Sequence, residues 1–388
     1  MNITSKIYYS ANNLPIGWSA LVKHDIFLQA HYLKALEEAS PNNIRLFYVG
    51  VFNEDRLVGV AIVQRVQLYL KDMFRKTQVS CIREFFKDIV SKILKGNILV
   101  VGNLTHTGQH GVFFNREDIS QSAYLESVFS ALENIKKEIK EKQNKKIRAI
   151  MFKDYFLNDG IHTEKSFFNS HKLYKVSVQP NMIMKIRPEW KVFDNYIANK
   201  TKKYRGRYKR AKKKLGTITC HELDLEAIKN NATKLHGLYL NVSNNAKFNT
   251  FLLPENHFYS LKFHLKENFK VFGYYLNNRL VGFFTLILNN KDLETYFLGY
   301  DSEHQYANQL YLNMLYRMAN YGIDNAFSAI VYARTAMEIK SSVGARPEAM
   351  AVYMKHTNNF VNGLLKQIFR LMNPKQDWKE RHPFKQID

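Results

Sequence analysis

The sequence predicts an α/β fold with mixed sheets that is built twice along the chain. Two segments, VGVFNEDRLVG at 49–59 and FGYYLNNRLVG at 272–282, share a Gly and the run Arg-Leu-Val-Gly. Each is followed by the same order of predicted elements, which is strand, loop, helix and strand. A segment dense in Lys and Arg separates the two copies. Self-similarity of this kind indicates a duplicated structural unit.

Each repeated segment predicts a β-hairpin. A polar pair, at 54–55 and at 277–278, lies between two β-rich runs, and the second runs cover 58–70 and 281–288. Polar turn residues flanked by such runs are a hairpin signal. Two unrelated hairpins that share four letters are the alternative, and the elements that follow favour duplication.

A β-α-β unit follows each hairpin. Apolar runs predict its strands, and a helical stretch lies between them. The strands of such a unit run parallel, so each sheet mixes parallel and antiparallel pairs. The predicted strand, helix and strand cover 98–102, 121–143 and 147–153 in the first half, and 293–299, 308–321 and 327–333 in the second.

A further helix is predicted between the first hairpin and the strand at 98–102. Apolar residues from Ile82 to Leu94 recur at helical spacing and form one face. We expect that face to pack against the core or another domain.

Residues 199–214, NKTKKYRGRYKRAKKK, contain ten Lys or Arg and no acid. Apolar and aromatic residues recur at helical spacing from Phe193 to Leu215, which predicts one helix with a narrow apolar seam. A solvated charged helix is the simpler interpretation. Like charges without internal ion pairs repel, however, so we expect an anion such as a phosphate backbone to face them. The predicted anion- or nucleic-acid-binding residues are Lys202, Lys203, Arg205, Arg207, Lys209, Arg210 and Lys212.

The length of 388 residues corresponds to about two or three domains. We expect an N-terminal domain over 1–185, a basic helical linker over 186–216 and a C-terminal domain over 217–388. Lys and Arg number 57 against 34 Asp and Glu, a net charge of +23. Such an excess favours an anionic partner: nucleic acid, a CoA-type phosphate or an acidic membrane surface. The hydrophobic content of 46% excludes a disordered chain.

Two cysteines, Cys81 and Cys220, are too few for a disulfide framework and favour a reducing compartment. The first residues lack the apolar stretch of a signal peptide. No apolar run approaches the roughly 18 residues of a membrane-spanning helix. We therefore expect a soluble, cytoplasmic protein without a transmembrane segment, and peripheral contact with a membrane stays open.

Familiar catalytic motifs are absent from the sequence. It contains no P-loop, no GxGxxG after a strand, no GxSxG and no HExxH. His106 and His110 lie four residues apart, but no acid or Cys follows nearby to complete a ligand set. No metal is expected.

The loop after the strand at 98–102 is a candidate cofactor site. Gly108, Gln109 and Gly111 lie in it, before the helix at 121–143. A glycine-containing loop that leads into a helix gathers backbone N–H groups, which suit a pyrophosphate. A plain strand-to-helix turn is the alternative, which the residues alone favour.

The second half has a candidate cleft at the carboxyl ends of its parallel strands, where α/β sheets bind ligands. Tyr300 ends one strand, Asn308 lies near the next helix start, and Arg334 follows the other strand, before Glu338 and Lys340. Arg334 and Lys340 are candidates to hold a phosphate or carboxylate. Glu338 is a candidate general base and a tyrosine a candidate general acid.

Glu338 also has a structural interpretation, which its spacing favours over catalysis. It lies three residues after Thr335, the spacing of a capping box at a helix start. The remaining candidates of this half have surface ion pairs as their alternative.

The duplicated hairpin with RLVG and the strand-loop-helix-strand after it resemble the GNAT acyl-CoA N-acyltransferase fold. Two such halves joined by KYRGRYKRAKKK resemble the FemABX (peptidoglycan bridge-forming) group and its acetyltransferase relatives. The stretch ARTAMEIKSSVGARPEAM resembles the terminal motif of those relatives, in which a Lys, here Lys340, precedes the pair Gly344-Ala345. The resemblance spans roughly 25–355. It implies two tandem GNAT-like domains with mixed sheets, joined by a basic helical segment.

The resemblance also implies transfer of an acyl or aminoacyl group to an amine. In GNAT enzymes, backbone N–H groups of a splayed strand and of the following helix start hold the CoA pyrophosphate. FemABX proteins instead use aminoacyl-tRNA. We expect an N-acyltransferase with acyl-CoA as co-substrate and an amine-bearing small molecule as acceptor. The alternative is a FemABX-like aminoacyltransferase that uses aminoacyl-tRNA and acts on a cell-wall precursor. The basic segment favours this alternative, because tRNA offers many phosphates.

A third hypothesis is a non-catalytic nucleic-acid-binding or scaffold protein on the same fold. Acyl-CoA enzymes carry a Gln/Arg-x-x-Gly-x-Gly/Ala loop, whereas the loop after Gly299 carries Asp301 and Glu303. That difference favours the third hypothesis over the acyl-CoA enzyme.

Overall fold

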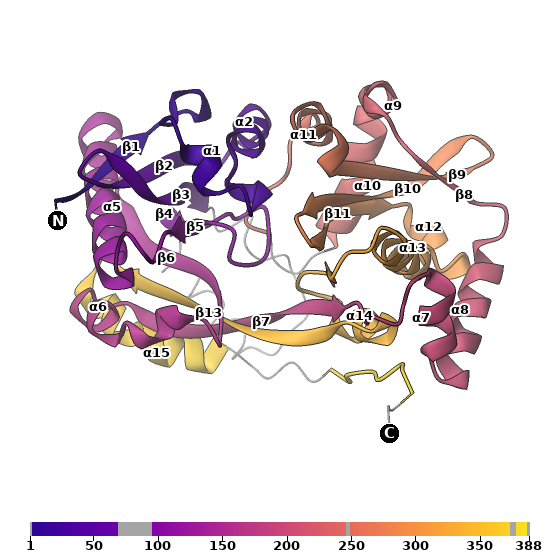
Figure 1. The fold of residues 1–388 in the computed structure, drawn as a ribbon. Helices are drawn as coiled ribbons and strands as arrows, with labels where there is room; N and C mark the ends of the chain where they lie inside the picture. The colour runs from indigo at the N-terminus through magenta and orange to yellow at the C-terminus, as the bar shows by residue number, and fades with distance from the viewer. Residues whose placement is uncertain (1, 69–94, 246–248, 373–377, 386–388) are drawn as a thin grey trace. The chain divides into compact units, whose positions relative to one another are not determined.

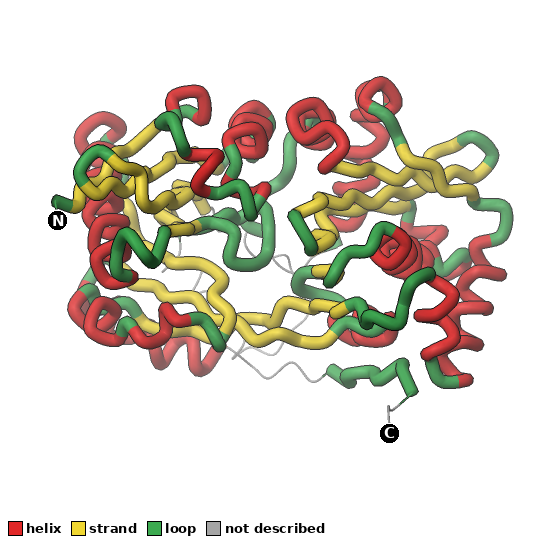
Figure 2. The backbone as a smooth tube through the Cα atoms, viewed as in Figure 1, coloured by secondary structure: helices red, strands yellow, loops and turns green. Residues whose placement is uncertain are grey.

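The computed structural model describes residues 2–68, 95–245, 249–372 and 378–385. The helix predicted at 82–94 and Cys81 lie outside the described residues. The chain divides into two compact units, whose elements are labelled in Figure 1 and coloured by type in Figure 2. Their segments are Met1–Val178, Lys247–Leu253 and Ala349–Lys375 for unit 1, and Gln179–Ala246, Pro254–Glu348 and Gln376–Asp388 for unit 2.

These bounds differ from the expected domains at 1–185, 186–216 and 217–388. The basic segment belongs to unit 2 rather than to a separate linker, and 349–375 belong to unit 1. The physical reason is strand pairing: β13 (Arg346–His356) pairs antiparallel with β6 (Ile147–Phe156) from Met350 onward. Pairing between segments so far apart in the chain leaves no local signal in the sequence.

Unit 1 is built on a mixed sheet with the strand order β1-β2-β3-β4-β6-β13, and β5 pairs with β3. The strands β4 and β6 are parallel, and their neighbours are antiparallel. Glu54, with φ of 57°, turns the hairpin between β2 and β3. The bounds are β1 (Ile3–Tyr8), β2 (Ile44–Asn53), β3 (Arg56–Leu68), β4 (Gly96–Val101) and β5 (Val112–Phe114).

Helix α5 (Gln121–Gln143) covers this sheet and buries its apolar face in the core of unit 1. The Ser120 hydroxyl accepts a hydrogen bond from the Ala123 N–H at its start, and Asn144 ends it in the left-handed region. Both caps are local, and the helix has the predicted bounds. The other helices among the described residues of unit 1 are η1 (Ala11–Asn13), α1 (Trp18–Leu21), η2 (Ile26–Leu28), α2 (Ala30–Glu38), η3 (Gly160–Thr163), α6 (Lys165–Ser170) and α15 (Asn359–Met372).

The strands of unit 2 also pair in a mixed arrangement, in the order β7-β12-β11-β10-β9-β8. Here β11 and β12 are parallel, and the other neighbouring pairs in this order are antiparallel. The hairpin between β9 and β10 turns at Asn277 and Asn278, which both have positive φ. The bounds are β7 (Tyr174–Lys185), which enters unit 2 at Gln179, β8 (Thr219–Glu222), β9 (Phe269–Leu276), β10 (Arg279–Asn289), β11 (Asp292–Tyr300) and β12 (Ala329–Val331).

Helix α13 (Leu310–Asp324) lies in the core of unit 2, and α10 (Ala232–Asn244) packs on β11. A Cβ at Gly299 of β11 would lie 2.3 Å from the Leu238 carbonyl carbon, so only glycine allows this approach of helix and strand. Where unit 2 is described, its remaining helices are α7 (Phe193–Asn199), α8 (Lys202–Leu215), α9 (Leu225–Asn230), α11 (His257–Leu265), η4 (Lys266–Asn268), α12 (Ser302–Ala307) and α14 (Met337–Val343).

Both units share one order of elements, which is a hairpin, a strand, a helix and a strand parallel to the previous one. In unit 1 these are β2-β3-β4-α5-β6, and in unit 2 they are β9-β10-β11-α13-β12. The predicted α/β fold with mixed sheets, built twice, is confirmed. Within the described ranges, every helix is too short or too polar to cross a lipid bilayer.

Candidate functional site

The glycine loop of unit 1 is held by the protein's own polar groups. The Gly108 N–H donates to Asp154 Oδ2 at 3.2 Å. The Gln109 side chain accepts from the Phe156 N–H at 3.0 Å and donates to Asp159 Oδ2 at 2.7 Å. The N–H group that was expected to meet a pyrophosphate therefore already meets a carboxylate, and this loop does not fit an added phosphate at Gly108.

Gly111 has a steric role in the same loop. Its carbonyl accepts from the Ile62 N–H at 2.8 Å, which attaches the loop to β3. A Cβ at this position would lie 2.2 Å from Gly102 Cα, so the two backbones approach as only glycine allows. Of the three predicted cofactor-binding residues in this loop, Gln109 lines a pocket.

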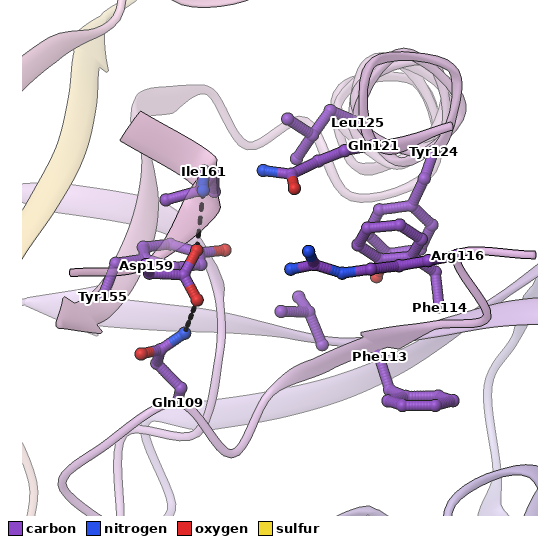
Figure 3. A pocket seen from close by; sticks show the side chains of 11 residues that line it. Gln109, Phe113, Phe114, Arg116, Gln121, Tyr124, Leu125, Tyr155, Asp159 and Ile161 are labelled. Carbon is purple, nitrogen blue, oxygen red and sulfur yellow. Dashed lines mark hydrogen bonds between the residues drawn. The ribbon is translucent and has the colours of Figure 1, made fainter. Parts of the chain in front are cut away.

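That pocket, which we call the unit 1 pocket, has a volume of about 220 Å³ and lies where β5, the start of α5 and the end of β6 meet (Figure 3). Stacked Phe114 and Tyr124, with ring centroids 4.7 Å apart, form part of its wall. Burial raises the pKa of Tyr124 and Tyr155. Its full lining is Gln109, Val112, Phe113, Phe114, Arg116, Gln121, Tyr124, Leu125, Tyr155, Asp159 and Ile161.

Sequence reasoning missed the charged residues of this pocket, Arg116 and Asp159. Asp159 follows the carboxyl end of β6, which is parallel to β4. The rule applied to the second half, that ligands bind beyond the carboxyl ends of parallel strands, would have identified Asp159 in the first half as well. Arg116 follows the short strand β5, which no pattern in the sequence predicted.

In unit 2, Tyr300 ends β11 and is half-buried. Its ring centroid lies 6.2 Å from that of Tyr311 on α13. Burial is the main cause that raises the pKa of both phenols. Tyr300 therefore stays protonated at neutral pH, as a proton donor requires.

Lys340 is buried on α14 and binds the turn between β12 and α14. Its Nζ donates to the carbonyl oxygens of Ala333 at 3.3 Å and Arg334 at 2.5 Å. Burial lowers the pKa of Lys340 to about 7. The turn is strained, because Ala333, Thr335 and Ala336 all have positive φ. The structure thus brings Lys340 and Arg334 together, through a backbone contact.

The capping box expected for Glu338 is wrong. Helix α14 starts after Ala336 and has no side-chain cap, because Thr335 and Ala336 lie in the left-handed region. Glu338 is exposed and instead forms an ion pair with Arg381, whose Nε donates to it at 3.1 Å.

The predicted single helix over the basic segment is also wrong, because the helix breaks at Lys200 into α7 and α8. Lys200 is fully buried: its Nζ donates to the Val343 carbonyl at 3.2 Å and lies 4.1 Å from the ring centroid of Tyr196 and 4.7 Å from that of Phe384. Burial lowers its pKa well below the usual value. The backbone of Lys200 is extended, and this conformation interrupts the helix between α7 and α8.

Asn308 anchors α8 to the start of α13. Its Nδ2 donates to the Lys214 carbonyl at 3.1 Å, and Asn313 Nδ2 donates to the Ala211 carbonyl at 2.9 Å. The predicted cofactor role of Asn308 stays a prediction. The contacts show that it places the basic helix next to the strand-loop-helix turn of unit 2.

A cationic cleft of about 790 Å³, which we call the α8 cleft, results from this placement. Helix α8 carries nine Lys or Arg in fourteen residues, and none forms an ion pair with a residue that the structure describes. Six of the eight lining residues are cationic. The lining is Lys203, Tyr204, Arg207, Arg210, Lys213, Lys214, Gln309 and Arg381.

The predicted anion-binding residues divide into three groups. Lys203, Arg207 and Arg210 line the α8 cleft. The Arg205 guanidinium donates to the Lys200 carbonyl at 2.5 Å, which holds the start of α8. The others lie on α8 outside the cleft lining and are exposed: Lys202, Lys209 and Lys212.

Solved structures share this fold. FemX aligns with a TM-score of 0.54 and 12% identity over 95% of this chain and 100% of its own. A tandem GNAT protein from the clavulanic acid biosynthesis pathway aligns with a TM-score of 0.51 and 8% identity over 92% of this chain and 99% of its own. No family model and no curated protein matches the sequence. The chain thus has a tandem GNAT-like fold related to that of FemX.

Proposed function

We propose that this protein is an acyltransferase that moves an acyl group from a phosphate-bearing donor to an amine. The position of the α8 cleft carries the proposal. Gln309 lines the cleft and is the residue from which α13 begins. This is the strand-loop-helix turn to which the GNAT resemblance assigns the donor pyrophosphate. Guanidinium and ammonium groups bind phosphate by charge-assisted hydrogen bonds.

Acyl-CoA is the donor that we propose first, with an amine-bearing small molecule as acceptor. The cleft volume of about 790 Å³ lies within the range of roughly 300–1,000 Å³ for small-molecule sites. The pyrophosphate would meet Arg207, Arg210 and Lys213, which come from successive turns of α8.

Aminoacyl-tRNA is the second candidate donor, with a cell-wall precursor as acceptor. Lys202, Lys209 and Lys212 support it, because they extend the positive surface of α8 beyond the cleft. A small cofactor leaves such charges unused, whereas a nucleic-acid backbone offers a phosphate at each nucleotide.

For the chemistry, we propose that Glu338 and Tyr300 transfer the protons. The neutral amine attacks the acyl carbonyl, a C–N bond forms, and the amine proton passes to Glu338. The bond from the carbonyl carbon to the sulfur of a thioester, or to the oxygen of an ester, breaks, and the leaving atom takes a proton from Tyr300. Arg334 would hold a phosphate or carboxylate. Lys340 is buried, so it positions the turn that carries Arg334.

Thermal denaturation with acetyl-CoA and with uncharged tRNA, each at low and high salt, tests the proposal. Stabilisation by acetyl-CoA supports the first donor, and stabilisation by tRNA with acyl transfer supports the second. Salt-steep binding of any RNA without transfer would instead support a non-catalytic binder. If neither compound stabilises the protein, the α8 cleft is not a donor site.

A further inference from the structure

We infer that the unit 1 pocket binds a small zwitterion: a free amino acid or a very short peptide that carries both an ammonium and a carboxylate. Figure 3 shows the Arg116 guanidinium reaching into the pocket toward the side that carries Asp159 and Gln109. Arg116 and Asp159 both line the pocket, yet they form no ion pair with each other. Opposite charges are thus presented to one cavity with a gap between them.

Arg116 and Gln121 form the side of the pocket that suits a carboxylate. Arg116 is exposed, forms no ion pair with any described residue, and lies 5.8 Å from the ring centroid of Phe114. A Cβ built on Gly160 would lie 3.5 Å from Gln121 Oε1 and 3.6 Å from an Arg116 terminal nitrogen. The Arg116 guanidinium and the Gln121 carboxamide therefore lie side by side next to Gly160. The guanidinium can donate two N–H groups to one carboxylate, and the Gln121 amide group can donate a third from its Nε2 when that nitrogen faces the ligand.

Asp159 forms the side that suits an ammonium. Its Oδ1 accepts from the Ile161 N–H at 2.7 Å, and its Oδ2 accepts from Gln109 Nε2 at 2.7 Å. Gln109 is itself held by the Phe156 N–H at 3.0 Å. These contacts fix the carboxylate, and each oxygen keeps a second lone pair for a ligand. A fixed acceptor binds an ammonium without the entropy cost of ordering a mobile side chain.

Size and charge together select the ligand class. At about 220 Å³ the pocket is smaller than the roughly 300–1,000 Å³ of typical small-molecule sites, so it admits a small molecule or one end of a larger one. A simple anion would meet repulsion from Asp159, and a simple cation would meet repulsion from Arg116. A zwitterion pairs with both groups. Arg116 and Asp159 are therefore sufficient to select a zwitterion over a simple anion or a simple cation. The inference concerns binding alone and does not depend on the acyl transfer proposed for unit 2.

Titration of the full chain with three probes, followed by calorimetry, tests the inference. Glycylglycine carries both charges, N-acetylglycine lacks the ammonium, and glycinamide lacks the carboxylate. We expect saturable binding of glycylglycine, and affinities at least about tenfold weaker for the other two probes, which each lose one charged contact. Equal affinity for the three probes, or the absence of saturable glycylglycine binding up to about 10 mM, would overturn the inference.

Variants locate the binding. Arg116→Gln and Asp159→Asn should each weaken glycylglycine at least about tenfold, and Gly160→Leu should weaken it as well, because the longer side chain would crowd Gln121 and Arg116. Arg148→Gln is the matched control, because Arg148 is exposed in unit 1 and does not line the pocket. Asp159 caps η3, so circular dichroism must show that the Asp159→Asn variant is still folded. Arg116 is exposed, and its replacement is not expected to disturb the fold. Unchanged binding in Arg116→Gln and Gly160→Leu would place the zwitterion elsewhere and refute the site.

Discussion

Glu338 accepts a hydrogen bond from Arg381 Nε at 3.1 Å, and the two side chains form an ion pair. Arg381 also lines the α8 cleft, and its backbone N–H donates to Ser341 Oγ at 3.0 Å. The carboxylate proposed as the general base is therefore connected by one side chain to the cleft proposed for the donor phosphates. This connection yields the first prediction.

Replacing Arg381 by Ala should weaken acetyl-CoA binding about tenfold, because the α8 cleft loses one charge-assisted contact. Lys379→Ala is the control, since Lys379 is exposed on the same segment and does not line the cleft. Isothermal titration of both variants measures the effect. A loss of equal size in the two variants would mean that general charge, not the contact of Arg381, matters.

Two triple variants of α8 should separate the two donors. Replacing Arg207, Arg210 and Lys213 by Ala removes cations that line the α8 cleft and should weaken both acetyl-CoA and tRNA. Replacing the exposed cations outside the lining should weaken tRNA alone and reduce its salt slope by about 0.7 per lost phosphate contact. The second set comprises Lys202, Lys209 and Lys212.

The measurement is binding affinity across a series of salt concentrations. If the second triple variant leaves the tRNA slope unchanged, the outer face of α8 is a solvated surface and the tRNA hypothesis loses its support. If the first triple variant binds both compounds as the parent protein does, the cleft is not the phosphate site.

The buried Lys340 should make stability depend on pH. Burial lowers its pKa to about 7, below the value of about 10.4 for an unfolded lysine. Between these values the unfolded state binds the extra proton, so the free energy of unfolding rises with pH, by up to about 1.4 kcal/mol per pH unit. Lys340→Met should therefore flatten the rise between pH 7 and 9.

Urea denaturation at several pH values between 7 and 9 measures the slope. This pH window lies below the range in which the tyrosines of the unfolded chain ionise. Lys200 contributes a rise of the same sign, so the variant should retain part of the slope. Lys379→Met, at an exposed position, should leave the slope as it is. An identical slope in Lys340→Met and the parent protein would show that Lys340 stays charged in the folded state.

Tyr300→Phe should lower kcat about a hundredfold with little change in KM, because it removes the proposed proton donor without altering the ring. Tyr306→Phe serves as the comparison, since Tyr306 is exposed on α12. Steady-state kinetics with the donor identified by denaturation give both constants. A Tyr300→Phe enzyme with parental kcat would remove Tyr300 from the mechanism.

Two glycines should respond to alanine in opposite directions. At Gly299 the new methyl group would lie 2.3 Å from the Leu238 backbone, so Gly299→Ala should destabilise the protein by about 3 kcal/mol or more. At Gly206, within α8, nothing lies within 4 Å, and Gly206→Ala should stabilise by up to about 1 kcal/mol. Thermal unfolding compares the two. Destabilisation by Gly206→Ala would contradict the open surroundings of that residue.

Helices and strands that are specified by neighbouring residues were predicted well from the sequence. The helix at 121–143 has the bounds of α5, because its apolar spacing lies within that stretch and its cap residues, Ser120 and Asn144, directly flank it. The duplicated order of elements was also predictable, since hairpin and β-α-β signals depend on neighbouring residues. The break between α7 and α8 was not, because it depends on the burial of Lys200 against Val343 and Phe384, which are distant in the chain.

The candidate sites show the same division. Lys340 and Arg334 were identified by their place after a parallel strand, but the hydrogen bond that makes Lys340 a support of the turn requires three-dimensional packing. Similarly, the sequence predicted that the Gly108 N–H could bind a phosphate, but in the folded protein this N–H donates to the Asp154 carboxylate.

The sequence by itself determined the duplicated α/β architecture and the dense positive charge of α8, because both are properties of residues close together in the chain. Only the tertiary structure decided which groups remain open to a ligand. Whether an N–H, a guanidinium or a carboxylate is open depends on what packs against it, and those partners come from remote segments. For that reason the α8 cleft with Arg381, and the unit 1 pocket with Arg116 and Asp159, emerged from the fold.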